Sequence, residues 1–222
     1  LRPLWVADAK AVAGKVSSYL KMPNVRVITN GIDIEKFTPG DKLTARQKLH
    51  LPENARLIGC AGRLEPVKGQ DVLIRALAHL PPAYHLAIAG DGSTKDALKH
   101  QVSQAGLASR VHFLGVVDDM PAFYQALDVF CLPSRFEGMP LSPLEAQACN
   151  IPSVITDVGG CSEVVCAQSS ILVPPDKPVC IAEAVLDLSV LSYRQNPRAF
   201  VQQNGNIKDT VFAYDALVAQ GG

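Results

Sequence analysis

The sequence predicts an α/β protein built on a doubly wound parallel sheet. From residue 56 onward short apolar runs recur, and they lack the polar alternation of strands with one face in water. Such runs are typical of parallel strands that helices cover on both faces. Longer segments with helical spacing separate the runs, and this alternation predicts strand–helix–strand crossovers. The expected strands are 57–61, 85–89, 111–114, 129–132, 153–156 and 171–173.

The helices between these strands follow from apolar periodicity. Residues 71–80 place Val72, Leu73, Ala76 and Leu77 on one helical face. The other helices are expected at 94–105, 120–126, 142–149 and 180–191. Each lies between two expected strands or follows the last one, as a doubly wound sheet requires.

The two ends of the chain fit this repeat less well. A strand at 4–7 and a helix at 10–20 are expected, and the run 25–28 then leads into the turn signal Asn30-Gly31. The polar stretch that follows, up to His50, is interpreted as a linker or as the end of a preceding domain. After Pro197 the chain is polar until a final helix at 210–219.

Composition excludes several classes of protein. The 222 residues carry 21 Lys and Arg against 21 Asp and Glu, and their mean hydropathy is +0.14. A general nucleic-acid binder would carry a basic excess, so none is expected. No apolar run approaches the ~20 residues of a membrane-spanning helix, and no signal-peptide pattern begins the chain. A soluble, cytoplasmic protein is predicted.

The six cysteines and five histidines show no spacing typical of a metal centre or of a Ser/His pair. The cysteines lie in apolar stretches without a Cys-x-x-Cys pair, which is typical of reduced core thiols in a cytosolic protein. No P-loop and no Gly-x-Ser-x-Gly motif occurs. Neither a metal site nor a nucleophilic serine is therefore expected.

The loop from Gly62 to Gly69 suits a phosphate ligand. It follows the strand at 57–61 and so lies at the carboxyl edge of the sheet, where ligands of open α/β sheets bind. Gly62 lets the backbone approach a ligand closely. Arg63 and Lys68 bring two cations to one loop, which suits a diphosphate. The alternative is a solvated loop with two ordinary surface cations.

A second loop follows the strand at 129–132 and holds two carboxylates eight residues apart, Glu137 and Glu145. The backbone N–H groups between Gly138 and Leu141 can bind an anion at a helix N-terminus. Pro140 lacks a donor, but it presets the first helical turn. This arrangement suits a hydroxyl-rich ligand attached to phosphate.

Glu145 has two interpretations. The run Ser142-Pro143-Leu144-Glu145 matches a capping box, in which Glu145 accepts from the Ser142 N–H and has only a structural role. A helix that instead begins near Gly138 leaves Glu145 free to bind a ligand. Both interpretations are open at this point.

The run Gly90-Asp91-Gly92 begins a dinucleotide-binding fingerprint. Lys95 occupies the position of its third glycine, and no acidic residue in a clean second-strand context completes it. An NAD-dependent dehydrogenase is therefore not expected.

Together these motifs resemble the C-terminal, nucleotide-sugar-binding half of a GT-B glycosyltransferase, in the large retaining family often called family 4 or glycosyl transferases group 1. The resemblance is collinear from about residue 4 to residue 173. Its five matching motifs are 27–33 with Phe37 and Pro39; 62–64 with Lys68 and Gly69; 133–134 with Glu137, Gly138 and 144–146; 158–160 with Glu163; and 172–175. Each motif alone is weak, but five in register are specific.

The resemblance implies a Rossmann-like fold and three parts. Residues 1–30 would be a remnant of the N-terminal acceptor domain and hinge, 31–196 the nucleotide-sugar-binding domain, and 197–222 a C-terminal helix and tail. We therefore expect a fragment that binds nucleotide but has little transferase activity alone, because half of the preorganised site is missing.

The resemblance also implies roles for matching residues. Arg63 and Lys68 would bind the donor diphosphate and stabilise the leaving phosphate, and Glu137 would contact the transferred sugar; these three are the expected catalytic residues. Glu145 would bond the ribose. The expected binding set is Gly62, Arg63, Lys68, Gly115, Val116, Glu137, Gly138, Met139, Pro140, Leu141 and Glu145, with the base near Gly115 and Val116. No metal or cofactor is implied, because side chains and a helix N-terminus stabilise the anion.

Three departures from the family pattern stand out. Asn150 replaces a glycine, so its turn needs Asn in a left-handed conformation. Ser169-Ser170 stands where the family has a glycine. From Pro178 onward the spacing drifts from the pattern.

The function implied is transfer of a sugar, with retention of configuration, from a nucleoside diphosphate to a carbohydrate or lipid-linked acceptor. UDP is expected before GDP, and cell-envelope polysaccharide or lipopolysaccharide biosynthesis is the expected setting. Association of the full-length enzyme with the inner face of the membrane is an open alternative to a free cytoplasmic location. Two other functions stay open: a non-transferase GT-B enzyme such as a nucleotide-sugar epimerase, and a binding-only α/β domain of receiver or flavodoxin type. A receiver would place an acidic cluster where Gly62 and Arg63 stand.

Overall fold

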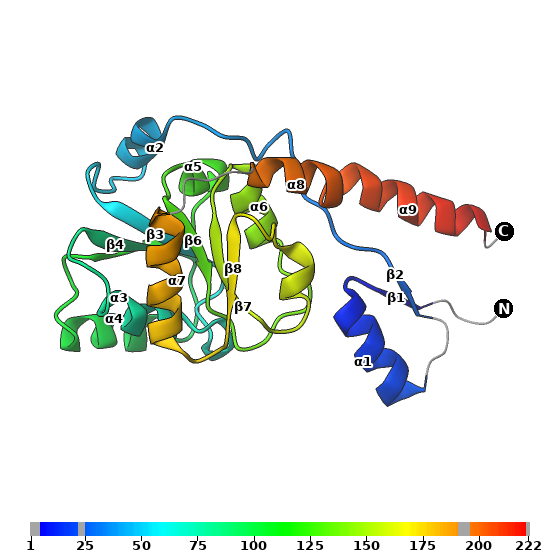
Figure 1. The fold of residues 1–222 in the computed structure, drawn as a ribbon, viewed down its shortest axis with the longest axis horizontal. Helices are drawn as coiled ribbons and strands as arrows, with labels where there is room; N and C mark the ends of the chain where they lie inside the picture. The colour runs from blue at the N-terminus through cyan, green and yellow to red at the C-terminus, as the bar shows by residue number, and fades with distance from the viewer. Residues whose placement is uncertain (1–4, 22–24, 191–195, 221–222) are drawn as a thin grey trace.

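Six parallel strands form the central sheet of the computed structural model, which describes residues 5–21, 25–190 and 196–220 (Figure 1). The strands follow the order β5-β4-β3-β6-β7-β8. Their bounds are β3 Arg56–Ala61, β4 Tyr84–Ala89, β5 Val111–Gly115, β6 Val129–Leu132, β7 Ser153–Thr156 and β8 Ser170–Val173. The order runs outward from β3 in one direction and from β6 in the other. The doubly wound prediction is confirmed, and each expected strand is present to within one residue.

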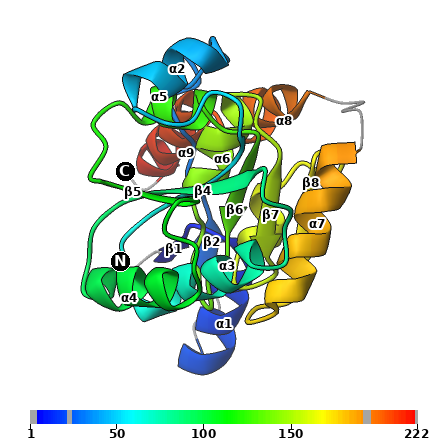
Figure 2. The same cartoon turned by 90° about the vertical axis from the view of Figure 1, so that its left-hand side faces the viewer.

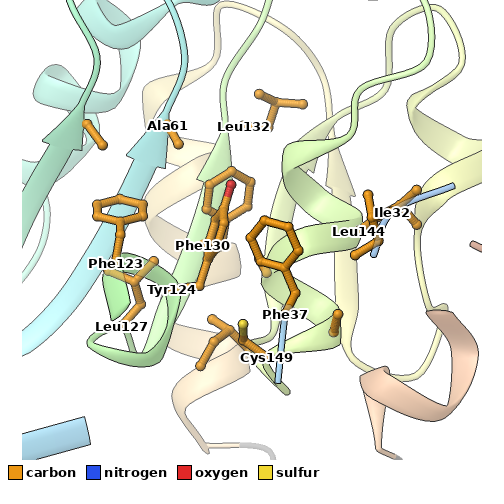
Figure 3. Packing of buried hydrophobic residues seen from close by; sticks show 14 of the residues in the cluster. Ile32, Phe37, Ala61, Phe123, Tyr124, Leu127, Phe130, Leu132, Leu144 and Cys149 are labelled. Carbon is orange, nitrogen blue, oxygen red and sulfur yellow. The ribbon is translucent and has the colours of Figure 1, made fainter. Parts of the chain in front are cut away.

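Helices cover both faces of this sheet (Figure 2). On one face lie α3 (Gln70–Leu77), α4 (Lys95–Gln104) and α7 (Pro178–Val190), and their apolar residues pack against Ile58 and Cys60 of β3. On the other face lie α5 (Met120–Gln125) and α6 (Ser142–Ala148), which pack against Leu57 and Ala61 of β3 (Figure 3). Successive side chains of a strand point to opposite faces, so β3 contributes apolar side chains to the core on each face of the sheet.

The stretch interpreted as a linker contains a helix instead, α2 (Lys42–Lys48). Asp41 caps it by accepting from the Thr44 N–H at 2.8 Å, and Ala45 belongs to the buried core. Arg46 is 4% exposed and donates to the carbonyls of Glu53, Ala55 and Ala126 and to Asp128. The linker interpretation is therefore wrong, because α2 is held mainly by polar contacts that apolar periodicity cannot detect.

The end of the chain forms two helices rather than one, α8 (Pro197–Asn204) and α9 (Ile207–Gln220). Asn196 caps α8 by accepting from the Arg198 N–H. The Arg198 guanidinium donates to the carbonyls of Ile34, Phe37 and Ala148, and Val201 is fully buried. The expected final helix at 210–219 lies within α9, whereas α8 was not expected in the polar stretch before it.

The first described residues form a small unit of their own. Strands β1 (Trp5–Ala7) and β2 (Val25–Val27) pair in parallel outside the six-stranded sheet, and α1 (Lys10–Leu20) connects them. Figure 1 shows α9 extending from the sheet on the side on which this unit lies, and Thr210 Oγ1 donates to the Thr29 carbonyl. The expected ends at Leu4 and Leu191 and the last two glycines lie outside the described residues. The division at residues 30 and 196 stays a prediction.

Two further expectations concern single residues. Asn150 has a φ of 66°, so the predicted left-handed conformation is confirmed. The six cysteines are free thiols, five of them buried. In the described ranges, no helix is long and apolar enough to cross a bilayer.

Candidate functional site

The site lies at the carboxyl ends of the two central strands, β3 and β6, which pair side by side. The strand order reverses between them, and ligands of open α/β sheets bind in the crevice at such a switch point. A hollow of about 350 Å³ opens there. It is lined by Ala61, Gly62, Arg63, Lys68, Met120, Tyr124, Glu137, Pro140, Leu141, Ser142 and Glu145. The structure thus brings together the three expected catalytic residues and most of the expected binding set.

Lys68 and Glu137 form the charged pair of the hollow. Lys68 ends the short 3-10 turn Pro66–Lys68, and its Nζ lies 2.7 Å from Glu137 Oε1. Ser134, which is fully buried, donates its hydroxyl to the same oxygen at 2.6 Å. The Glu137 side chain is 8% exposed. No described residue donates to Oε2, so this oxygen is left to accept from a ligand hydroxyl.

Arg63 is the second cation of the hollow. Its side chain is exposed, and no described residue bonds its guanidinium. Backbone hydrogen bonds hold the loop that carries it, because the Gly62 N–H donates to the Ala89 carbonyl and the Leu64 N–H donates to the Asp91 carbonyl. Arg63 thus presents a cation that no described residue hydrogen-bonds, on a backbone held in place, and both properties suit the binding of an anion.

The glycines of the run Gly90-Asp91-Gly92 explain how this loop packs. A Cβ on Gly90 would lie 2.0 Å from the carbonyl oxygen of Gly62, and one on Gly92 would lie 2.4 Å from that of Leu64. Both glycines also have positive φ angles, 137° and 159°. Their lack of side chains lets the β4 loop touch the β3 loop, and this packing accounts for them without a dinucleotide.

Arg135 joins the two loops of the site and was missed in the sequence. Its backbone N–H donates to Val67 at 2.8 Å, and its guanidinium bonds both carboxylate oxygens of Asp71 and one of Asp176. The hydrogen bond to Asp71, followed by that to Asp176, raises the pKa of Arg135 above its ordinary value. No sequence signal distinguished Arg135 from a surface cation, because its partners come from other loops.

The segment 138–141 is not the first turn of a helix. Helix α6 begins at Ser142, with Leu141 as its N-cap. The Gly138 carbonyl accepts from the Gly160 N–H at 2.8 Å, so it is not available to start a helical ladder. The alternative of a helix start near Gly138 is therefore wrong. Even so, the N–H groups of Gly138, Met139 and Leu141 find no acceptor among the described residues.

Gly138 and Met139 do not line the hollow. Met139 is 8% exposed, and its Sδ accepts from the Asn30 N–H at 3.3 Å. Neither residue lines the hollow, in contrast to Pro140 and Leu141. Their expected part in phosphate binding stays a prediction that rests on backbone N–H groups alone.

Glu145 does not form the capping box either. Helix α6 has no side-chain cap, and the carboxylate of Glu145 instead accepts from the Tyr124 hydroxyl at 2.6 Å. Burial raises the pKa of Glu145 above its ordinary value, and the bond from Tyr124 offsets this in part. Burial and then the neighbouring Glu145 raise the pKa of Tyr124 well above its ordinary value. Glu145 thus lines the hollow with one oxygen that no described residue bonds.

Tyr124 is a site residue that the sequence did not single out. Its ring packs edge-to-face against Phe37, Phe123 and Phe130 within the core (Figure 3). Tyr124 also lines the hollow, where its hydroxyl donates to Glu145. The one available signal was a hydroxyl-bearing ring in an apolar helix, which most often means a satisfied core tyrosine.

The expected base site lies apart from the hollow. Gly115 has a φ of 68°, and its carbonyl accepts from the Gly90 N–H at 2.7 Å. Val116 is 77% exposed. Neither residue lines the hollow, so their contact with a base stays a prediction. Among the described residues, no group of three or more His, Cys, Asp or Glu is placed to hold a metal ion.

The chain is similar in sequence to known glycosyltransferases. The sequence profile of the family described as glycosyl transferases group 1 matches residues 41–204. The lipopolysaccharide core biosynthesis mannosyltransferase LpsB of Rhizobium meliloti is 40% identical over 168 residues, which cover 72% of this chain and 48% of LpsB. The D-inositol 3-phosphate glycosyltransferase of Salinispora arenicola is 35% identical over 96% of this chain and 52% of its own length. The chain thus spans about half the length of these relatives.

A solved structure shows the same fold. Anabaena Alr3699/HepE in complex with UDP superposes with a TM-score of 0.85 at 26% sequence identity, over 97% of this chain and 64% of HepE. HepE has also been solved in complex with UDP-glucose.

Proposed function

The chain belongs to the family of glycosyl transferases group 1, and from this premise we propose that it is the donor-binding part of a retaining glycosyltransferase that uses a nucleoside-diphosphate sugar. One observation carries the proposal: two cations and two carboxylates from separate loops converge on one hollow at the switch point of the sheet. The binding of UDP and UDP-glucose by HepE supports a uridine nucleotide as the donor. The similarity to LpsB supports a carbohydrate or lipid-linked acceptor of the cell envelope.

In this proposal the cations serve the leaving group. The bond between the anomeric carbon and the phosphate oxygen breaks, and negative charge collects on the departing diphosphate. No residue in the described part of the chain hydrogen-bonds the Arg63 side chain, and the Lys68 side chain is 23% exposed, so both cations are available to neutralise that charge. Preorganised donors of this kind act in the transition state more than in the ground state.

The carboxylates serve the two sugars of the donor. Glu137 Oε2 would accept from a hydroxyl of the transferred sugar, while Lys68 and Ser134 hold Oε1. Glu145 would accept from a ribose hydroxyl with the oxygen that Tyr124 does not engage. Each part of a nucleotide sugar thereby meets a complementary side chain: the diphosphate meets the two cations, and each of the two sugars meets a carboxylate. No metal or cofactor is proposed.

Calorimetric titration of this chain with UDP, GDP and NAD tests the proposal. We expect UDP to bind more tightly than GDP and NAD not to bind measurably. Lys68→Met should weaken UDP binding about 10-fold or more, because a hydrogen bond to a charged group contributes about 1.5–3 kcal/mol. The matched control is Lys208→Met, which removes a 70% exposed lysine paired with Glu35.

Two outcomes would contradict the proposal. One is the absence of binding for both nucleoside diphosphates, and the other is an equal effect of the two lysine variants. Product analysis of the complete enzyme then separates a transferase from a nucleotide-sugar epimerase, since an epimerase converts one nucleotide sugar into its epimer and needs no acceptor.

A further inference from the structure

The first turn of helix α1 is capped by a residue far away in the sequence. Ala9 occupies the N-cap position, and the turn contains no acidic residue of its own. The N–H groups of Lys10 and Ala11 instead donate to the two carboxylate oxygens of Glu163, each at 2.9 Å. Glu163 belongs to the 3-10 turn Cys161–Val164 that follows β7. Both oxygens of its carboxylate are thus committed to the start of α1.

The turn before Glu163 packs directly on the loop that carries Glu137. The Gly160 N–H donates to the Gly138 carbonyl at 2.8 Å. A Cβ on Gly159 would lie 1.8 Å from the Glu137 carbonyl oxygen, and one on Gly160 would lie 2.5 Å from the Gly138 oxygen and 2.8 Å from the Ala9 Cβ. The backbone of residues 159–160 therefore lies between the start of α1 and the loop that carries Glu137, and it contacts both directly because neither glycine has a side chain.

Two more contacts join the first unit to the same loop. The Lys15 ammonium of α1 lies 5.7 Å from the centre of the Phe136 ring, and the Asn30 N–H donates to Met139. Residues on either side of Glu137 are thus in contact with residues 9–30. The two bonds that Glu163 accepts from Lys10 and Ala11 are shorter than these two contacts, and a single side-chain substitution removes both of them.

We propose that Glu163 is a positioning residue that couples the start of α1 to the loop carrying Glu137, and that this coupling sets the affinity of the hollow for a nucleotide sugar. The proposal rests on the proposed function for the identity of the ligand. When Glu163 binds the start of α1, the backbone of Gly159 and Gly160 stays packed against Glu137 and Gly138. The loop then keeps the geometry that directs Glu137 Oε2 into the hollow. Coupling between two sites is reciprocal, so a ligand that orders the loop must also order the start of α1.

Amide exchange measured by NMR tests this reciprocity on the chain itself, with UDP-glucose and GDP-mannose as probes. In the wild type, the nucleotide sugar that binds should slow exchange at the Lys10 and Ala11 amides at least threefold. In Glu163→Ala the ligand should leave those amides unchanged, and its affinity should fall about 3- to 10-fold. Glu163→Gln keeps one carbonyl oxygen as an acceptor, so it should recover part of both effects.

The matched control is Asp41→Ala, which removes the side-chain cap of another helix, α2. It should lower the Tm, while ligand affinity and the ligand-dependent protection of Lys10 and Ala11 stay at wild-type values. If both cap variants lose affinity in proportion to their loss of Tm, Glu163 is merely structural and the inference is overturned. The same holds if Glu163→Ala binds and protects like the wild type. If the wild type binds neither nucleotide sugar, the proposed function fails and this inference with it.

Discussion

The two carboxylates of the hollow have different surroundings although they are eight residues apart. Glu137 has a cation at 2.7 Å and a hydroxyl donor at 2.6 Å, so its orientation is fixed by charge. Within the described ranges, one group hydrogen-bonds the Glu145 carboxylate, the hydroxyl of Tyr124. This difference suits Glu137 to the part of the donor where charge develops and Glu145 to a neutral hydroxyl.

Glu145→Gln separates binding from stability. Burial raises the pKa of Glu145 above its ordinary value of 4.5, so the folded protein holds this proton more tightly than the unfolded chain does. The stability that this provides is complete below about pH 4.5 and is lost as the pH rises through the raised pKa. The Gln variant stays neutral, so its Tm should exceed that of the wild type at pH 7 and match it near pH 4. Its affinity for UDP should fall severalfold, because an amide oxygen is a weaker acceptor for the ribose.

Thermal unfolding at both pH values and calorimetry with UDP check this prediction. Tyr124→Phe is the control, since it removes the donor and leaves the carboxylate. A Gln variant that is less stable at pH 7 and binds UDP as the wild type does would show that Glu145 has a structural role only.

At the scale of single residues, those site side chains were predictable from the sequence that the order of the strands is enough to bring together. Arg63, Lys68, Glu137 and Glu145 follow β3 and β6, and the carboxyl ends of neighbouring parallel strands meet at one edge. Tyr124 and Arg135 could not be predicted in the same way. Their roles come from packing between elements, and a single sequence does not encode that as a spacing.

At the scale of elements, apolar periodicity found the helices that pack through apolar faces and missed two that are fixed through arginine. Arg46 and Arg198 reach into the fold and donate to carbonyls of neighbouring loops. Their helices, α2 and α8, have few apolar residues, so their pattern resembled a linker. A cap signal was present at Asp41 and at Asn196, but a cap without a periodic face is weak evidence for a helix.

The turn after β7 should be the element most sensitive to a small substitution. Gly159 has a φ of 57°, and an added Cβ would lie 1.8 Å from the Glu137 carbonyl oxygen. Gly159→Ala must therefore displace the loop that carries Glu137. We expect a clear loss of Tm and a loss of UDP affinity of about 10-fold or more.

Gly106→Ala is the control for backbone strain. Gly106 has a φ of 68° with nothing within 4 Å of an added Cβ, so the variant carries the strain of about 1 kcal/mol without the contact. Its UDP affinity should be unchanged. Equal effects of the two variants on UDP binding would contradict the placement of the Gly159 turn against the site.

At the scale of the whole molecule, the order of strands determines where the site lies. Strands β3 and β6 lie at the centre, and the sheet grows outward from them in both directions. This was predictable, because buried parallel runs joined by helices have few allowed topologies. The shape of the hollow was not, because it depends on where α6 begins and on how the Gly138 carbonyl is satisfied.

If a diphosphate binds between the loops after β3 and β6, an NMR titration of the amide resonances with UDP will show it. We expect UDP to shift the resonances of Gly62, Leu141 and Ser142, and uridine without phosphate to leave them in place. Shifts concentrated at the opposite edge of the sheet, around Arg56 and Lys42, would contradict it.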